Sequence, residues 1–402
     1  MNGKNGKSRT TTCAKSAFLL FCLCLSLGTT SGDSKARKIV IFQDWFSGED
    51  AQDYLLSKSG ALKHKSLKLI NGAAVDISSQ MEKALKEKKE ILRIDDDLVL
   101  CATQTYTQNK KKGADPQPDQ KLPWNISQVG ADLAWTTTTG KAVRVAICDT
   151  GIDLDHPDLI QNIAGEVNLI KPKKTGDDDS GHGTHVAGVV AAADNLIGVV
   201  GVGPEIALYA VKVLNHKGKG WLSDLIDALD WCIANDIQVI NMSLGTLNDN
   251  PSFHEAVQRV YKTGIVQVAS AGNNGEEGGD ISFPARYPET IAVSAVDMFG
   301  NFASSSSYGD AIDLTAPGVD IRSTYEDGGY EIFDGTSMSA PHVTGAAALI
   351  LSASPLGLYD ENGNGFWDPS EVKIKLMRTA LHLGLPAVQQ GAGLVRADEA
   401  IR

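Results

Sequence analysis

Short apolar runs without regular polar alternation recur between residues 143 and 296. They cover residues 143–148, 207–213, 238–242, 265–269 and 291–296. Runs of this kind predict strands that are buried on both faces of a parallel sheet. Helices are expected between and after them, beginning near His182, Ser223, Ser252, Ser337 and Pro369. The sequence therefore predicts an α/β fold in which helices sandwich a parallel sheet and the site forms at the carboxyl ends of the strands.

The N-terminal 32 residues have the pattern of a signal peptide. Four basic residues precede an apolar run of eleven residues, 17–27, and small polar residues follow at 28–32. Eleven residues are too few to span a bilayer as a helix. Lipid attachment is the minor alternative, because neither Cys22 nor Cys24 follows the small residue that such a site requires. We expect a signal peptide at 1–32, a secreted protein and no membrane contact in the mature form.

A small lysine-rich unit follows the signal peptide. Strands are predicted at 38–42, 68–77 and 91–100, and helices at 51–57 and 79–89. The next stretch, 104–121, is polar and carries two prolines and a lysine run, as is typical of an exposed linker that proteases cut. We expect a small α+β unit at 33–103, a linker with the maturation cleavage at 104–121, and a second domain at 122–402.

Charge and cysteine placement limit the partners of the chain. The formal net charge of −12 argues against a nucleic-acid partner, because phosphate binding requires a basic surface. Of six cysteines, only Cys148 and Cys232 lie beyond the leader and the small unit. Both lie among apolar residues, so two buried free thiols are expected. A bridge between them is the less favoured alternative.

Three side chains stand where an α/β sheet places its chemistry. Asp149 follows the strand VRVAIC, His182 opens the helix of GHGTHVAG, and Ser337 opens the helix of GTSMSAPH. Taken alone, Asp149 would be interpreted as a turn residue and Ser337 as a helix cap. His182 and His185 do not form the HExxH pattern of a metal site. Together they supply a nucleophile, a base and an orienting carboxylate. The helix start at Ser337 favours a developing oxyanion, and Asn273 is expected to be its second donor.

Four sequence blocks resemble the signature blocks of the subtilisin family. They read AICDTGIDLDHPDL, GHGTHVAGVVAA, VINMSLG with VASAGNNG, and DGTSMSAPHVTGAAALIL. The similarity extends from about Gln120 to Leu394, and the order Asp, His, Ser is the one for which subtilisin is the reference example. The resemblance implies a serine endopeptidase with Ser337 as nucleophile, His182 as general base and acid, and Asp149 fixing the histidine tautomer. Asn273 and the Ser337 N–H would form the oxyanion hole, while His185 would be structural.

The same resemblance implies how substrate binds. A peptide would lie as an added strand between residues 217–222 and 243–245, and glycines would let its backbone approach closely. The first specificity pocket would be walled by 243–245 and 269–272. The substrate-binding residues are Gly218, Gly220, Leu222, Ser243, Leu244, Gly245, Ala271, Gly272 and Ser282. None is charged, so an apolar or broadly tolerant pocket is expected.

Calcium is the expected metal, at two sites rich in oxygen donors. The resemblance implies a first site from Gln120, Asp158, Asn195 and the carbonyls of Ala193, Ile197 and Val199. The run DENGNGFWDPSE at 360–371 independently fits an EF-hand-like loop between two helices. Its ligands would be Asp360, Asn362, Asn364, Phe366, Asp368 and Glu371. The alternative for this second site is a Gly/Asn-rich turn.

The small N-terminal unit resembles the family's inhibitory prosegment, through KIVIF, LINGAAVDIS and ILRIDDDLVL. The resemblance implies a ferredoxin-like propeptide that assists folding and whose end occupies the active site. The expected partners are thus protein or peptide substrates and the chain's own propeptide, in a monomer. A catalytically silent binding or chaperone protein is one alternative, and a serine carboxyl peptidase is another. The intact residues Asp149, His182, Asn273 and Ser337 favour the endopeptidase.

Overall fold

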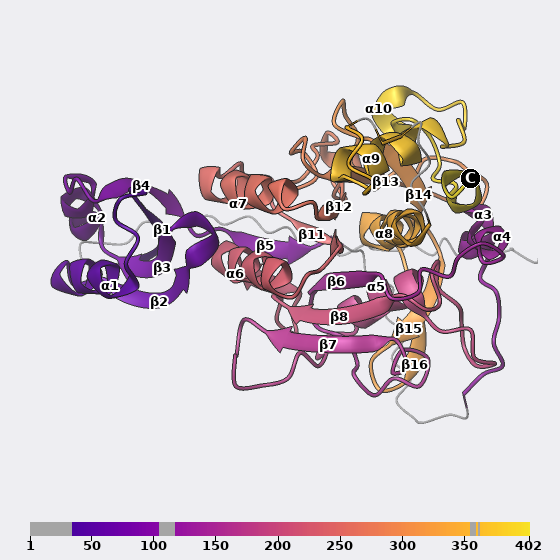
Figure 1. The fold of residues 1–402 in the computed structure, drawn as a ribbon, viewed down its shortest axis with the longest axis horizontal. Coiled ribbons are helices and arrows are strands. Elements are labelled where there is room, and N and C mark those ends of the chain that lie inside the picture. The colour runs from indigo at the N-terminus through magenta and orange to yellow at the C-terminus, as the bar shows by residue number, and fades with distance from the viewer. Residues whose placement is uncertain (1–33, 104–116, 354–358, 361) are drawn as a thin grey trace, which may run out of the picture. The chain divides into compact units, whose positions relative to one another are not determined.

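The computed structural model describes residues 34–103, 117–353, 359–360 and 362–402, and Lys35–Arg402 forms one compact unit (Figure 1). The expected signal peptide and most of the expected linker lie outside the described residues. No helix in the described part is both long and apolar enough to cross a membrane.

A seven-stranded sheet forms the centre of the larger part of the fold. Its strand order is β14-β13-β12-β10-β6-β8-β7, and every neighbouring pair is parallel. The strands are β6 (Arg144–Asp149), β7 (Ile163–Asn168), β8 (Ala207–Lys212), β10 (Val239–Met242), β12 (Val266–Ser270), β13 (Ile291–Val296) and β14 (Leu314–Pro317). The predicted α/β class is confirmed.

Two of these strands were not predicted, and both lie at the edges of the sheet. An edge strand is covered less completely, so its sequence lacks the continuous apolar signal of a central strand. In β7 (IAGEVN) half-buried and exposed residues alternate, whereas β14 (LTAP) is buried but has only four residues and ends in a proline. The five central strands that were predicted all form.

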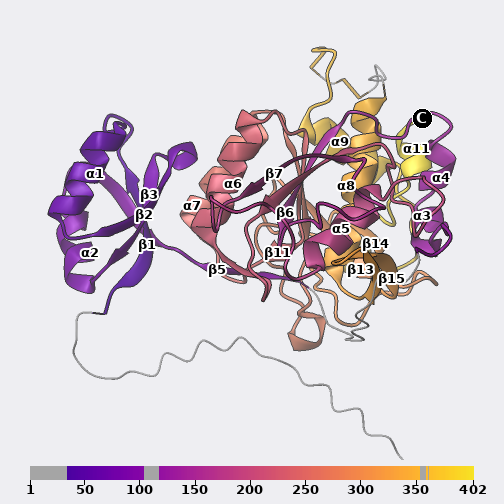
Figure 2. The same ribbon diagram turned by 90° about the horizontal axis from the view of Figure 1, so that it is seen from below.

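Helices cover both faces of the sheet (Figures 1 and 2). Side chains alternate along β6, so Val145 and Ile147 join the core with α5 and α8, while Ala146 and Cys148 join the core with α6 and α7. These helices are α5 (His182–Ala191), α8 (Thr336–Ser352), α6 (Leu222–Ala234) and α7 (Pro251–Lys262). Outside the sheet and these helices, the larger part also contains α3 (Trp124–Gln128), α4 (Ala131–Ala134), η2 (Gly275–Glu277), β15 (Ile321–Tyr325), β16 (Gly329–Phe333), α9 (Pro369–Arg378), α10 (Ala387–Gln390) and α11 (Ala397–Ala400).

The N-terminal unit is a four-stranded antiparallel sheet with two helices and its own apolar core. Its order is β2-β3-β1-β4, the ferredoxin-like arrangement of the element sequence βαββαβ. The elements are β1 (Ala36–Phe42), α1 (Glu49–Lys58), β2 (Leu62–Leu67), η1 (Lys68–Ile70), β3 (Gly72–Ile77), α2 (Ser79–Lys86) and β4 (Ile91–Asp96).

Two strand predictions in this unit were wrong. The run 68–77 begins with the 3₁₀ turn η1, and Asn71 at φ 47° then starts β3, while the unpredicted β2 is a lysine-containing edge strand. The run 91–100 is not one strand. It divides into β4 and β5 (Val99–Ala102), which belong to different sheets. An apolar run alone does not reveal such a break, because both halves are extended and both are partly buried.

Strand β5 joins the N-terminal unit to the larger part of the fold. It pairs antiparallel with β9 (Lys219–Trp221) on one side and with β11 (Leu244–Gly245) on the other. The two segments on either side are those between which substrate was expected to bind. The end of the N-terminal unit therefore lies where the sequence places a substrate strand.

The N-terminal unit also contacts the first turns of two helices, and it caps one of them, α6. Both Asp97 carboxylate oxygens accept hydrogen bonds from Ser223, from its N–H at 2.8 Å and from its Oγ at 2.7 Å, and Arg37 pairs with Asp97 at 2.7 Å. Ser223 lies in the first turn of α6, whose N–H groups lack helical partners. On α7, Ser252 donates to Asp95 at 2.6 Å.

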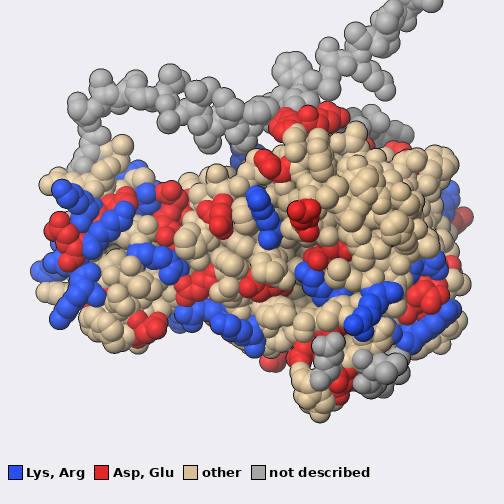
Figure 3. All heavy atoms as spheres, turned by 90° about the horizontal axis from the view of Figure 1, so that it is seen from above, with Lys and Arg blue, Asp and Glu red and all other residues tan. Residues whose placement is uncertain are grey.

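Acidic and basic side chains are interspersed over the face drawn in Figure 3.

Replacing Asp97 with alanine should weaken this attachment. The change removes a helix cap and leaves Arg37 without its buried partner, so we expect a loss of about 1–3 kcal/mol. Thermal unfolding of the full chain, with Ser337→Ala in both variants and in their reference protein, measures it. The matched control is Asp96→Ala, because the Asp96 side chain is 66% exposed and pairs only with Lys38 among the described residues, which should cost under about 1 kcal/mol. Equal losses in the two variants would contradict the capping role.

Candidate active site

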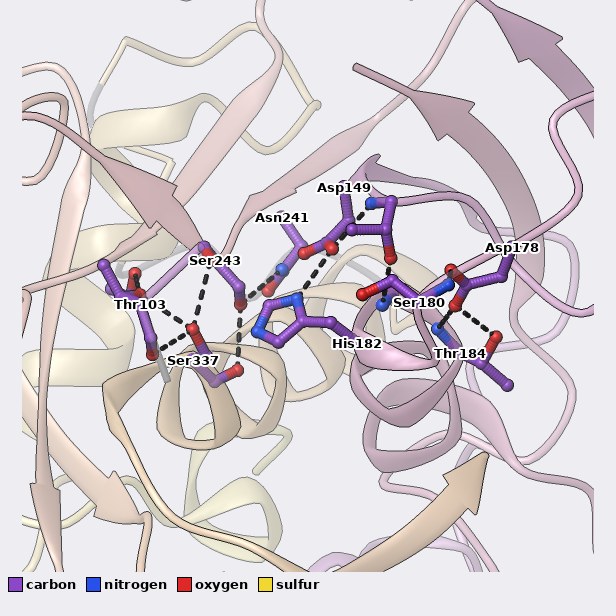
Figure 4. A network of polar contacts seen from close by, with 12 residues as sticks. Thr103, Asp149, Asp178, Ser180, His182, Thr184, Asn241, Ser243 and Ser337 are labelled. Atoms are coloured by element: carbon purple, nitrogen blue, oxygen red, sulfur yellow. Dashed lines mark hydrogen bonds and ion pairs between the residues drawn. The ribbon is translucent and has the colours of Figure 1, made fainter. Parts of the chain in front are cut away.

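The three predicted catalytic side chains converge at the carboxyl edge of the sheet (Figure 4). Asp149 ends β6, His182 is the first residue of α5, and Ser337 is the second residue of α8. All three are fully buried by the surrounding chain. His182 Nδ1 lies 2.6 Å from Asp149 Oδ1, which also accepts the Thr150 N–H at 2.7 Å. This geometry fixes the imidazole ring and leaves its Nε2 as the atom available for proton transfer.

Ser337 is engaged by Thr103, the residue that follows β5. Its hydroxyl donates to the Thr103 carbonyl oxygen, and its N–H lies 3.3 Å from the same oxygen. The Thr103 N–H in turn donates to the Ser243 carbonyl at 3.3 Å. His182 Nε2 has no hydrogen-bond partner within the described part of the chain. The nucleophile thus contacts the carbonyl group of a peptide segment that lies in the cleft.

Asn273 is oriented as a hydrogen-bond donor to this site. Its Oδ1 accepts from the N–H and the hydroxyl of Thr336, both at 3.0 Å, which fixes the amide. Its Nδ2 is buried and has no partner among the described residues. Because a buried N–H without a partner is costly, such a group indicates a site that a ligand completes. The site is next to the Ser337 N–H, at the start of α8.

Other polar residues around the triad have structural contacts. Burial lowers the pKa of His185 to about 3, and its ring stacks on Phe333 with centroids 4.5 Å apart. Asp178 accepts hydrogen bonds from the Thr184 N–H and hydroxyl, and Asp179 pairs with Lys212 at 2.6 Å. These contacts fit the structural role expected of His185 and give both aspartates structural partners.

The expected substrate-binding residues surround β5 and Thr103. Leu100 and Cys101 pair with Gly220 and Lys219 of β9, and the Ala102 N–H donates to the Gly218 carbonyl at 2.9 Å. A methyl group added at Gly220 would lie 2.0 Å from the Val213 carbonyl, so no side chain fits there. On the other side, Leu244 and Gly245 pair with Ala102 and Cys101. Leu222, Leu244 and Ala271 belong to the apolar cluster that contains Leu100, and Gly272 and Ser282 are buried beyond them.

The first expected calcium site keeps several oxygens unpaired. Asp158 is buried, its Oδ1 has no partner among the described residues, and burial raises its pKa to about 6. The carbonyls of Ala193, Ile197 and Val199 accept no backbone hydrogen bond in the described part. Gln120 differs from expectation, since its Oε1 already accepts the N–H groups of Asn195 and Leu196 at 2.7 Å. Asn195 Oδ1 accepts the Ile197 N–H at 3.0 Å.

The second expected calcium site is arranged largely as a capped turn. Asp360 accepts the N–H groups of Asn364 and Gly365, and Asp368 with Glu371 forms the capping box of α9. The Phe366 side chain is exposed, and both Asn362 and Asn364 donate to Asp368. A helix lies on each side of the loop, as expected, but α8 ends at Ser352 and Tyr359 and Asp360 are not helical, so the preceding helix does not run directly into the loop. No group of three His, Cys, Asp or Glu side chains among the described residues is placed to hold a metal.

The two cysteines of the larger part are buried and not bridged. Burial, together with the neighbouring Cys148 thiol, raises the pKa of Cys232. Both thiols belong to the apolar cluster beneath α6 and α7. The expectation of two free thiols is met.

Sequence reasoning missed Thr103 and did not single out Ser270. The resemblance implied that the end of the small N-terminal unit occupies the active site, but it did not identify Thr103 as the residue that contacts Ser337. Ser270 ends β12, and its Oγ lies 2.6 Å from Thr103 Oγ1. Its only signal in the sequence is its position three residues before Asn273.

Comparison with known proteins agrees with this geometry. The profile of the subtilase family matches residues 140–394. Subtilisin E of Bacillus subtilis (strain 168) is 39% identical over 351 residues, covering 86% of this chain and 84% of that protein. Subtilisin of Bacillus pumilus is 44% identical over 286 residues, covering 70% and 99%. Subtilisin Savinase of Lederbergia lenta is 42% identical over 284 residues, covering 70% and 100%. The chain therefore belongs to the subtilase family and is a serine-type endopeptidase.

Proposed function

We propose that this endopeptidase is made as a secreted, monomeric precursor whose residues 33–103 inhibit the active site until the chain cuts its own Thr103–Gln104 bond. The observation that carries the proposal is the contact of the Thr103 carbonyl with Ser337. That bond is the first bond of the linker expected from the sequence at 104–121. Secretion rests on the signal-peptide pattern of residues 1–32.

Ser337 would attack the carbonyl carbon of the scissile bond, with His182 Nε2 accepting the hydroxyl proton. The Asp149 carboxylate, 2.6 Å from His182 Nδ1, keeps the proton on Nδ1 and stabilises the imidazolium that forms. His182 then donates a proton to the leaving amine, and an acyl-enzyme remains on Ser337. Water attacks this ester through the same base, and the freed acid leaves Ser337 restored.

The negative charge on the carbonyl oxygen would be held by two donors. One is the Ser337 N–H, which already lies 3.3 Å from the Thr103 oxygen, and the other is the unpartnered Asn273 Nδ2. Both stand at the N-terminal end of α8, a helix of 17 residues, where the helix dipole adds favourable potential. A catalytically silent binding protein would require neither the unpartnered Asn273 Nδ2 nor the contact of the Ser337 N–H with a peptide carbonyl.

The inhibited state follows from the same contacts. Strand β5 fills the place of a substrate strand, and the four-stranded unit is anchored on α6 and α7, so cutting one bond does not release it at once. Binding through main-chain ladders is independent of most side chains. Once the propeptide leaves, other protein segments with an apolar residue at the position of the buried Leu100 would therefore bind between β9 and β11 in the same way.

Replacing Ser337 with alanine should leave the purified precursor uncut, because nucleophile and maturation protease would be the same group. Wild-type protein should release a propeptide whose carboxyl-terminal residue is Thr103, as measured by intact mass. The matched control is Ser339→Ala, two residues along α8, whose buried hydroxyl has no partner among the described residues. The Ser339→Ala precursor should still be cut after Thr103. Cleavage of the pure Ser337→Ala precursor, or a released propeptide ending elsewhere, would contradict self-cleavage at this bond.

Replacing Asn273 with alanine should lower kcat and leave KM nearly unchanged, because the hydrogen bond to the oxyanion forms only in the transition state. In subtilisin, the reference case for this effect, loss of the oxyanion asparagine lowers kcat about 10²–10³-fold. Steady-state kinetics on a peptide substrate measure the split. Asn274→Ala is the control, since that side chain bonds to Asp280 and Ser307 and not to the catalytic residues. A rise confined to KM in Asn273→Ala would refute the assignment.

Calcium would stabilise the folded enzyme at the first site. The unpaired Asp158 Oδ1 and the three unpaired carbonyls form an oxygen donor set that suits this ion. An ion there would tie the loop 193–199 to Asp158, which follows the strand that carries Asp149. The loop 360–371 as a second site rests on its sequence pattern, and its Glu371 already serves in the cap of α9.

Chelation should lower the melting temperature of the mature enzyme by about 5–10 °C, since an ion bound only by the folded state contributes a few kcal/mol. Asp158→Asn should abolish this calcium-dependent shift. Glu371→Gln tests the second site: elemental analysis should show two ions falling to one if the loop binds calcium, and an unchanged count if it is a turn. A melting temperature that is insensitive to chelators in the wild type would contradict the first site.

A further inference from the structure

The side chain of Thr103 is recognised by hydroxyl groups. Its Oγ1 lies 2.6 Å from Ser270 Oγ and 2.7 Å from Ser337 Oγ. Ser270 is fully buried at the carboxyl end of β12, and its other contact is long, 3.5 Å to the Met242 carbonyl. Thr103 therefore supplies the only short hydrogen bond that Ser270 makes among the described residues. A buried hydroxyl with one good partner loses much when that partner is replaced by a methyl group.

The directions of these hydrogen bonds are mutually consistent. The single Ser337 hydroxyl proton is donated to a carbonyl oxygen, that of Thr103 or, at 3.1 Å, that of Ser243. The Ser337 oxygen is then an acceptor for the Thr103 hydroxyl, whose own oxygen accepts from Ser270. Each hydroxyl donates once and accepts at most once in this chain. A valine in place of Thr103 has the same shape but removes the hydroxyl that links Ser270 to Ser337 in this series of hydrogen bonds.

Ser282, one of the expected substrate-binding residues, lies close to both glycine segments of the expected pocket. A methyl group added at Gly245 would lie 2.9 Å from Ser282 Cβ, and one added at Gly272 would lie 2.6 Å from Ser282 Oγ. The Ser282 side chain thus packs against both glycine segments that were expected to wall the pocket. It occupies space into which a long side chain would otherwise extend. An aromatic residue would have to displace Ser282 from this buried position.

We infer that the enzyme selects a small residue with a β-hydroxyl, threonine foremost, on the acyl side of the bond it cuts, with Ser270 reading the hydroxyl and Ser282 limiting the size. The inference rests on the proposed function, because it treats Thr103 as the chain's own substrate residue. The inferred selectivity differs from the apolar or tolerant pocket that the sequence suggests. Only the fold shows that the Ser270 hydroxyl contacts Thr103 and that Ser282 packs against Gly245 and Gly272.

The test compares internally quenched peptides Val-Leu-Ala-Ala-X-Gln, with X as threonine, serine, valine or phenylalanine, on the mature wild-type enzyme. Threonine and valine have nearly equal volume, so their ratio isolates the hydrogen bond. We expect kcat/KM for threonine to exceed that for valine about tenfold. Phenylalanine should be the poorest of the four. A threonine-to-valine ratio near one, or a preference for phenylalanine, overturns the inference.

Two variants assign the effect to its residues. Ser270→Ala should bring the threonine-to-valine ratio towards one, and Ser282→Gly should raise phenylalanine relative to threonine. Ser294→Ala is the control, because Ser294 is equally buried on the neighbouring strand β13 and bonds to Gln389, outside the cleft. Its ratios should match the wild type. A ratio that Ser270→Ala leaves unchanged overturns the role of Ser270.

Titration with a serine-directed fluorophosphonate separates this inference from the proposed function. Stoichiometric labelling that Ser337→Ala abolishes, together with cleavage of any of the four peptides, shows that the endopeptidase is active whatever its selectivity. An enzyme that labels fully and cuts phenylalanine best refutes only the pocket assignment. A protein that neither labels nor cuts any peptide removes both.

Discussion

The contact between His182 Nδ1 and Asp149 Oδ1 joins two fully buried side chains at 2.6 Å. Each group would be costly to bury alone, because charge and polarity require a partner away from water. Their pairing depends on the sheet: β6 ends at Asp149, α5 starts at His182, and both are surrounded by the core shared with α8. The position of Ser337 follows, since α8 packs across the same strand ends. The catalytic site is thus a consequence of how the central helices cover the sheet.

The N-terminal unit enters this site rather than merely covering it. Strand β5 makes the antiparallel ladders on both sides that a substrate would make, and it ends with the Thr103 carbonyl at Ser337. The rest of the unit binds elsewhere, through Asp97 on α6 and Asp95 on α7. Recognition of the cleft and attachment to the helices are therefore carried by different parts of one segment. In the proposed function, this division would present the Thr103–Gln104 bond to Ser337 while the contacts with α6 and α7 hold the unit in place.

The prediction of the fold from the sequence succeeded where burial is complete and failed where it is partial. The five central strands lie between two helical layers, so their apolar runs are continuous. The edge strands β2 and β7 are partly exposed, and β14 has only four residues. Their sequences therefore lack the continuous apolar run by which the central strands were predicted. The run 91–100 appeared as one strand because its two halves are extended and adjacent. Only long-range pairing assigns them to different sheets.

For the site, the sequence by itself determined the reacting groups. Asp149, His182, Asn273 and Ser337 lie in motifs whose chemistry is evident from residue type and position at element ends. Tertiary structure alone decided which residue of the N-terminal unit contacts Ser337 and how the pocket is shaped. The Thr103–Ser337 and Thr103–Ser270 contacts join residues 234 and 167 positions apart, and Ser282 limits the pocket only because it packs against Gly245 and Gly272. Such contacts arise from the closure of loops between distant elements, and no local pattern of residues encodes them.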